Sequence, residues 1–135
     1  MKIFVDTSAW CALTDLKDKN HTKAGNLFNK INDKGYFLAT SDYILDETLT
    51  LLRFKLGHPA AVMFGEDLLS SKVCQVFEID QKIKQKAWDI FVKFDDKNFS
   101  FTDCTSFALI GELGIKSVFA FDVHFKQYGL NIFSD

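Results

Sequence analysis

Short apolar runs alternate along this chain with longer stretches in which apolar residues recur at helical spacing. Most of the short runs are continuously apolar, which is typical of parallel strands whose two faces are both covered. This pattern predicts strands over 2–5, 36–39, 73–79 and 117–121, and a weaker one over 131–133. Helical spacing predicts helices over 8–13, 21–33, 42–56, 60–70, 81–94 and 102–113.

Turn-forming residues support this order of elements. Gly35 and Gly114 each follow a predicted helix and precede a predicted strand, where helix-ending glycines belong. Pro59 separates two of the helices. The chain has no internal repeat and no low-complexity linker, so we expect a single domain over 1–135. Alternating strands and helices predict an open α/β sandwich with a mostly parallel sheet.

Composition excludes several classes of protein. A hydrophobic content of 47% in 135 residues excludes a disordered chain, and a net charge of -2 argues against nucleic-acid binding through bulk positive charge. An enzyme that holds RNA through metal ions and a local basic patch is still allowed. Cys11, Cys74 and Cys104 form no CxxC pair, which argues against structural zinc and suits a reducing compartment. With no apolar leader or membrane segment, we expect a cytoplasmic protein.

Four acids have unusual positions. Asp6 and Asp122 end apolar runs, Asp103 lies in the first turn of a predicted helix, and Glu47 lies within another. Each also has an ordinary explanation. Asp6 and Asp122 would cap helices, although Thr7 and Ser8 could cap the first helix equally well. Asp103 would complete an [ST]xx[DE] capping box, and Glu47 would reach outward to water.

Helical spacing distinguishes Glu47 from its neighbour. Glu47 shares a helix face with Ile44, Leu51 and Phe54, whereas Asp46 shares one with polar residues. We therefore expect Asp46 to point to water and Glu47 to border the buried side, where an unpaired carboxylate is costly. Asp103 likewise shares a face with apolar residues, Phe107 and Ile110.

The four acids together predict a metal site. A parallel sheet can bring strand ends and helix starts to one edge, where ligands gather. Two carboxylates about 5 Å apart repel by about 3 kcal/mol at an effective dielectric constant of about 20. A divalent cation removes this repulsion. Oxygen ligands without His or Cys favour Mg²⁺ or Mn²⁺ over zinc.

The segments that carry these acids resemble a known family. In order, they are "FVDTSAW", "SDYILDETLTLLR", "SFTDCTSFAL" and "VFAFDVHFKQYG". Nearly the whole chain resembles PIN-domain proteins, especially the toxin ribonucleases of VapBC-type toxin–antitoxin pairs. The resemblance implies a three-layer α/β/α sandwich around a mostly parallel sheet. It implies Asp6, Glu47, Asp103 and Asp122 as catalytic and metal-binding residues, with Thr7 or Ser8 and also Thr102 as supporting polar groups.

The resemblance also implies an activity. It is Mg²⁺- or Mn²⁺-dependent endonucleolytic hydrolysis of RNA, by a toxin that pairs with a small antitoxin and forms a homodimer. Asp6 and Asp103 would be the most direct ligands, with Glu47 and Asp122 binding a second ion or acting through waters. The alternative is a catalytically inactive PIN scaffold that binds RNA or protein. Receiver domains and haloacid-dehalogenase-type phosphatases fit less well, because the first strand lacks an adjacent acid pair or a DxD motif.

Several basic residues are candidates for substrate contacts. They are Lys17, Lys19, His21 and Lys23 after the first helix, Lys126 near the C-terminus, and His124 beside Asp122. Solvated surface explains the lysines equally well, and His124 would more simply pack in a turn. The three histidines have no metal-ligand spacing. Trp10 and Trp88 would fill the core or a subunit interface.

Overall fold

A four-stranded sheet forms the centre of the fold in the computed structural model, which describes residues 1–134. The strands are β1 (Lys2–Val5), β2 (Phe37–Ser41), β3 (Cys74–Phe77) and β4 (Ser117–Phe119). Their order across the sheet is β3-β2-β1-β4, and every pair is parallel. The predicted parallel sheet is therefore confirmed.

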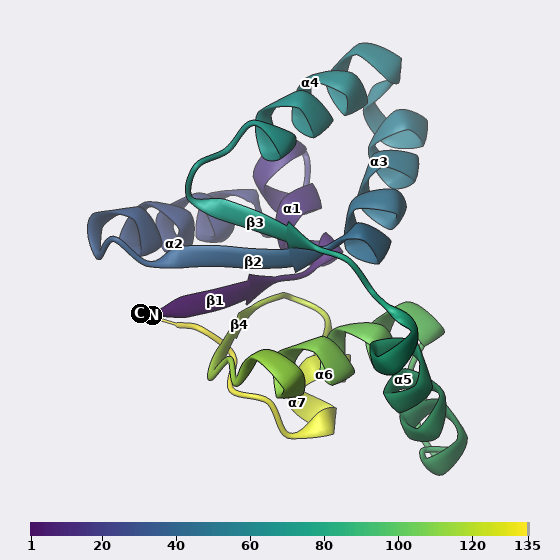
Figure 1. Cartoon of the computed structure of the whole chain (residues 1–135). Helices are drawn as coiled ribbons and strands as arrows, with labels where there is room; N and C mark the ends of the chain where they lie inside the picture. The colour runs from purple at the N-terminus through teal and green to yellow at the C-terminus, as the bar shows by residue number, and fades with distance from the viewer. Residues whose placement is uncertain (135) are drawn as a thin grey trace.

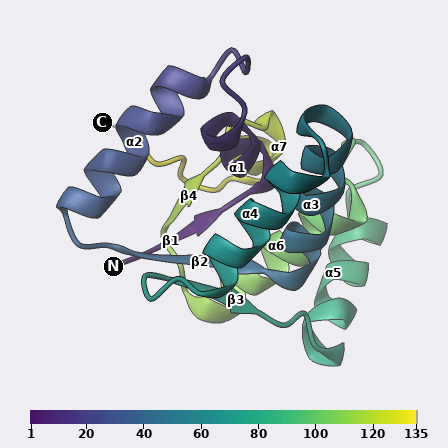
Figure 2. The same cartoon turned by 90° about the horizontal axis from the view of Figure 1, so that it is seen from above.

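Helices cover both faces of this sheet (Figure 1). They are α1 (Thr7–Thr14), α2 (His21–Asp33), α3 (Asp42–Leu56), α4 (His58–Leu69), α5 (Gln81–Lys93), α6 (Phe101–Leu113) and α7 (Val123–Tyr128). In Figure 1, α1 and α4 lie above the sheet, α2 lies behind it, and α5, α6 and α7 lie below it. Figure 2 shows α3 and α5 towards the same end of the molecule. The arrangement is the three-layer α/β/α sandwich that the resemblance implied.

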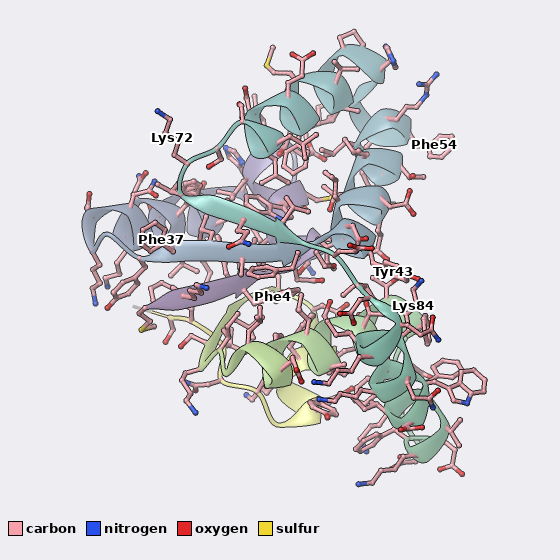
Figure 3. All side chains as sticks on the ribbon, in the orientation of Figure 1. Phe4, Phe37, Tyr43, Phe54, Lys72 and Lys84 are labelled. Atoms are coloured by element: carbon pink, nitrogen blue, oxygen red, sulfur yellow. The ribbon has the colours of Figure 1, made fainter. Side chains whose placement is uncertain are left out.

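Burial explains the continuously apolar strands. Ile3, Phe4 and Val5 of β1 are all fully buried, although successive side chains point to opposite faces of the sheet. Phe4 points down from β1 towards the lower layer of helices (Figure 3). Both faces of a central strand must be apolar when helices cover both, which is why the strand pattern does not alternate.

The structure moves some predicted boundaries. The helices predicted over 21–33 and 42–56 are confirmed, whereas β2 extends to Ser41 and β3 is shorter than predicted. The weak strand over 131–133 is a single bridge between Val118 and Ile132. Residues after Asp122 form α7 rather than a turn, because the aspartate caps the helix and Gly129, at a positive φ of 101°, ends it.

An aromatic cluster holds α7 against the rest of the lower layer. Phe125 is fully buried and packs on Phe4 and Phe107, with ring centroids 6.4 and 5.2 Å apart. Tyr128 stacks on Phe107 at 4.2 Å, nearly parallel to it. These contacts fix the position of a short helix that could not be stable in isolation.

The structure also shows the environments of the cysteines and the tryptophans. Cys11 and Cys104 are buried, and all three cysteines are free. Trp10 is buried in the core, whereas Trp88 is 53% exposed on α5 and stacks on Phe91. Among residues 1–134, no helix is long and apolar enough to cross a membrane.

The anchoring of α7 predicts a specific loss of stability. Phe125→Ala should lower the free energy of unfolding by about 3–5 kcal/mol, because it leaves a cavity beneath the helix. Val123→Ala on the same helix is the control, since Val123 is 57% exposed, and it should change stability by less than about 0.5 kcal/mol. Urea unfolding followed by circular dichroism measures both. Equal effects of the two substitutions would contradict this account of α7.

Candidate functional site

Two of the acids are brought together by neighbouring strands. Asp6 directly follows β1, and Asp122 follows β4, its parallel neighbour. The backbone N–H of Asp6 donates to the carbonyl oxygen of Phe119 at 3.1 Å, so the pairing continues to the acid itself. The chain leaves β1 towards β2 on one side, while β4 lies on the other. This is the switch point at which open α/β sheets bind ligands.

The other two acids come from helices. Asp103 lies in the first turn of α6, where its Oδ2 accepts from the backbone N–H of Ser100 at 3.0 Å. The Ser100 hydroxyl accepts from the backbone N–H of Asp103, so the predicted capping box is present. Glu47 is half-buried in the middle of α3, and Asp46 is exposed as predicted.

All four acids line one cleft of about 800 Å³. Asp6 and Asp103 are nearly buried, with 4% and 8% of their surface exposed. Lysines from two other segments also line the cleft: Lys17 and Lys19 from the α1–α2 loop, and Lys55 from the end of α3. The cleft therefore combines a group of carboxylates with three cations. Lys23 and Lys126, also considered from the sequence, line a separate pocket.

The predicted supporting residues have different positions. The Ser8 hydroxyl donates to Asp6 Oδ2 at 2.7 Å and accepts from the backbone N–H of Phe121 at 2.9 Å. It therefore links the acid after β1 to the segment after β4. The Thr7 hydroxyl instead accepts from Thr48 at 3.2 Å. Thr102 is not among the residues that line the cleft, and its carbonyl accepts from Thr105.

Asp6 and Asp122 each cap a helix and also line the cleft, and the capping of the first helix differs from the prediction. Thr7 and Ser8 were equal candidates to cap the first helix, but Asp6 caps α1, accepting from the backbone N–H of Ser8 at 3.2 Å. The reason is that α1 begins at Thr7, one residue earlier than predicted, so Asp6 occupies the N-cap position. Asp122 caps α7 in the same way. For Asp6 and Asp122, capping a helix and lining the cleft therefore do not exclude each other.

The expected surroundings of Glu47 were partly wrong. Leu51 and Phe54 were expected on the buried side of α3, yet they are 37% and 82% exposed. Figure 3 shows Phe54 pointing away from the molecule. The buried stripe consists of Ile44, Thr48 and Leu52, at intervals of four residues. The adjacent stripe, Glu47, Leu51 and Lys55, lines the cleft. Glu47 thus lies on the cleft side of α3.

His124 was considered from the sequence only as a possible substrate contact or a packed turn residue, and not as a partner of the acids. Its Nδ1 lies 2.8 Å from Asp103 Oδ2 and 3.1 Å from Asp122 Oδ1. One potential ligand atom from each of these three residues lies within 4.8 Å of the others. The "DVH" spacing alone gives no such signal, because Asp103 comes from a distant segment. The sequence predicted a group of oxygen ligands without His or Cys, whereas the structure places a histidine nitrogen beside two of the carboxylates.

Burial dominates the electrostatics of the site. It raises the pKa of the Asp6 carboxyl to about 7, while hydrogen bonds from Ser8 lower that pKa and the charge of Asp103 raises it further. Burial also raises the pKa of the Cys11 thiol, which lines the cleft, to about 11. A carboxyl held this far from its ordinary pKa is a common feature of functional sites. Hard carboxylate oxygens are suitable ligands for Mg²⁺ or Mn²⁺.

The raised pKa predicts how Asp6→Asn changes stability with pH. Between pH 3.8 and about 7, folded wild-type protein keeps a proton on Asp6 that the unfolded chain has released. Its unfolding free energy therefore falls as pH rises through this window, and asparagine removes that dependence. The stability of Asp6→Asn relative to wild type should increase by about 2–3 kcal/mol from about pH 5 to about pH 8. Urea unfolding with a chelator present measures this difference, and a constant difference would contradict it.

Comparison with known proteins agrees with this geometry. The chain is 39% identical over 127 residues to the 23S rRNA-specific endonuclease VapC20 of Mycobacterium tuberculosis, covering 94% of each protein. It is 31% identical over 128 residues to a VapC ribonuclease of Archaeoglobus fulgidus, covering 93% of this chain and 80% of that protein.

Solved structures give the same result. The crystal structure of M. tuberculosis VapC20, described as a sarcin–ricin loop cleaving toxin, superposes with a TM-score of 0.88 at 36% identity over 95% of each chain. VapBC2 of Rickettsia felis, solved with a DNA fragment from its promoter, has a TM-score of 0.74 at 12% identity over 98% of each chain, which shows the fold alone. The family model of the PIN domain matches residues 3–130, and this chain therefore belongs to the PIN domain family.

Proposed function

We propose that this protein is a metal-dependent endoribonuclease and the toxin of a toxin–antitoxin pair, with residues 1–135 acting as a single PIN-like domain. The observation that carries the proposal is the convergence of Asp6, Glu47, Asp103 and Asp122 on one cleft. Buried carboxylates in such a group are costly without a cation, so their retention supports catalysis rather than an inactive scaffold.

We propose Mg²⁺ or Mn²⁺ as the cofactor, held by the four carboxylates, with Asp6 and Asp103 as the most direct ligands. When bound, such an ion lowers the pKa of a water molecule and stabilises charge on a phosphate. The protein contributes the arrangement of the carboxylates. Ser8 fixes Asp6 by a short hydrogen bond, and the capping box fixes Asp103 at the start of α6. A carboxyl with a pKa near 7 can also exchange a proton at neutral pH.

The lysines of the cleft support an RNA substrate. Lys17, Lys19 and Lys55 lie around the same cleft as the acids. Lysine ammonium groups bind backbone phosphates and carry no sequence information by themselves. The single arginine, Arg53, is exposed on α3 and does not line the cleft. We therefore propose that lysines hold the RNA backbone while the acids act on one phosphodiester bond.

We propose ribosomal RNA of the large subunit as the substrate. The support is the 39% identity, over nearly the full length of both chains, to a protein named a 23S rRNA-specific endonuclease. Together with this substrate, we propose that the protein acts in the cytoplasm.

We further propose a small antitoxin as the inhibitory partner, and a homodimer as the active assembly. The relatives in M. tuberculosis and A. fulgidus described above are both named VapC. Exposed apolar residues on α3 and α5 support contact with other proteins. They include Phe54, Trp88, Phe91 and Val92.

The proposed activity predicts two inactive variants. Asp6→Asn and Asp103→Asn should each reduce RNA cleavage in Mg²⁺ or Mn²⁺ by about 100-fold or more, because each removes a charged ligand. Both should stay folded by circular dichroism. Mapping of new RNA ends, on purified ribosomes and after induced expression, measures the activity and identifies the cleaved bond.

The control for both variants is Asp46→Asn, an exposed acid next to Glu47 in the sequence. It should cleave like wild type, because Asp46 does not line the cleft. Cleavage by Asp103→Asn at the wild-type rate would refute the site. New ends in transfer or messenger RNA but not in ribosomal RNA would refute only the proposed substrate.

The lysines predict a change in the salt dependence of binding. In an Asp103→Asn background, which prevents cleavage, Lys17→Gln and Lys55→Gln should each weaken RNA binding. Each should also reduce the slope of log K against log salt by about 0.7, the value for one phosphate contact in a single strand. Lys116→Gln is the control, because the exposed Lys116 lies at the amino end of β4, opposite the strand end that leads to Asp122, and does not line the cleft. Fluorescence anisotropy at several salt concentrations measures this, and equal slopes for all variants would contradict the assignment.

A further inference from the structure

His124 makes an unusual set of contacts beside the proposed metal ligands. It lies in the first turn of α7, and its Nδ1 approaches carboxylates from two different segments. These are Asp103 Oδ2 at 2.8 Å and Asp122 Oδ1 at 3.1 Å. The imidazole ring therefore lies between the acid in α6 and the acid that precedes α7. His124 is therefore positioned to set how the two carboxylates are oriented.

The chemistry of the partners determines the tautomer of the ring. An ionised carboxylate only accepts hydrogen bonds, so a nitrogen that contacts two of them must carry a proton. Nδ1–H thus donates to Asp103 Oδ2 and lies beside Asp122 Oδ1 at 3.1 Å, whatever the state of Nε2. A protonated Nδ1 has no lone pair for a metal ion. In this arrangement, Nδ1 acts on the carboxylates rather than as a ligand.

The hydrogen bonds occupy one oxygen of each carboxylate. Asp103 Oδ2 accepts from Nδ1 of His124 and from the backbone N–H of Ser100. Asp122 Oδ1 is 3.1 Å from the same Nδ1 and accepts from the backbone N–H of His124 at 2.9 Å. Both hydrogen bonds to Asp103 are thus on Oδ2, and both the hydrogen bond and the Nδ1 contact of Asp122 are on Oδ1. The second oxygens, Oδ1 of Asp103 and Oδ2 of Asp122, have neither of these donors.

The ring itself is held by packing. It meets Phe99 edge-on, with centroids 5.7 Å apart and an interplanar angle of 79°. Phe99 is 6% exposed and packs in turn on Phe94, Phe107 and Tyr128. The next residue, Phe125, is fully buried. The orientation of the imidazole is thus set by the aromatic core.

We propose that His124 is a positioning residue of the metal centre. Its Nδ1–H binds Oδ2 of Asp103, and its backbone N–H binds Oδ1 of Asp122, which also lies 3.1 Å from Nδ1, so that the remaining oxygen of each acid is available to a divalent ion. The inference rests on the proposed function, because it assumes that these acids bind a metal. Partners that orient ligating carboxylates are worth about 10- to 100-fold in metal affinity.

Two substitutions separate the hydrogen bond from the shape of the ring. His124→Phe keeps an aromatic ring against Phe99 but has no donor. His124→Asn loses the ring, yet its side-chain N–H₂ group lies close to the position of Nδ1. Mn²⁺ binding to chelator-treated protein, measured by the EPR signal of free Mn²⁺, gives the affinity without any cleavage assay. His124→Phe should bind Mn²⁺ about 10- to 100-fold more weakly than wild type. His124→Asn should be within about threefold of wild type, because the donor is retained.

Spectroscopy on the wild type tests the inference without a variant. Electron spin echo modulation of bound Mn²⁺ should show no directly coordinated imidazole nitrogen. A strong nitrogen coupling, lost when histidine is ¹⁵N-labelled, would make His124 a ligand and overturn the inference. This measurement decides the question even where His124→Phe does not fold. The control His58→Phe, at an exposed histidine outside the cleft, should bind Mn²⁺ like wild type.

The outcomes separate this inference from the proposed function. Wild-type protein that binds no Mn²⁺ would refute the metal site, and the inference with it. Wild-type binding together with unchanged affinity in a folded His124→Phe would refute only the role of His124. Weak binding by His124→Phe and near-normal binding by His124→Asn would support both.

Discussion

The pairing of β1 with β4 is the contact on which the site depends. These strands are far apart in sequence, and the hydrogen bond from Asp6 N–H to the Phe119 carbonyl extends their pairing to the first acid. Ser8 then bonds both to Asp6 and to the backbone N–H of Phe121. A shift of one residue in this register would turn each side chain to the other face of the sheet. The fully buried apolar residues of β1 make such a shift costly.

Helix caps bring charge to an otherwise apolar centre. Asp6 and Asp122 are the N-caps of α1 and α7, where free backbone N–H groups need acceptors. Asp103 accepts from the backbone N–H of Ser100 in the capping box of α6. These backbone donors favour the charged carboxylate, whereas burial opposes it at Asp6, whose pKa it raises. The caps therefore allow the fold to hold several carboxylates around one cleft. Accepting backbone N–H groups at the start of a helix thus holds each of these acids where it could bind the proposed metal ion.

The arrangement of the cleft also explains how a protein with a net negative charge can present basic residues to a ligand. The net charge is -2, yet Lys17, Lys19 and Lys55 lie around the same cleft as the acids. Charges close to a bound phosphate act strongly, whereas distant charges are screened by salt. The overall charge of the chain is therefore a poor guide to its ligand. The position of a few lysines around the cleft is a better guide to the ligand than the net charge.

The sequence by itself determined the order of the elements as far as β4, the parallel sheet, and four of the acids that line one cleft. Those features depend on local spacing and on apolar runs, which a linear pattern records. The tertiary structure decided which stripe of α3 faces the cleft, because Glu47 and the exposed Phe54 belong to helix faces whose neighbours come from other segments. It also decided that His124 joins Asp103 and Asp122, since residues 21 positions apart meet only when α7 packs on α6. Spacing along the chain predicts a helix face, but only the packing of distant elements decides what that face contacts.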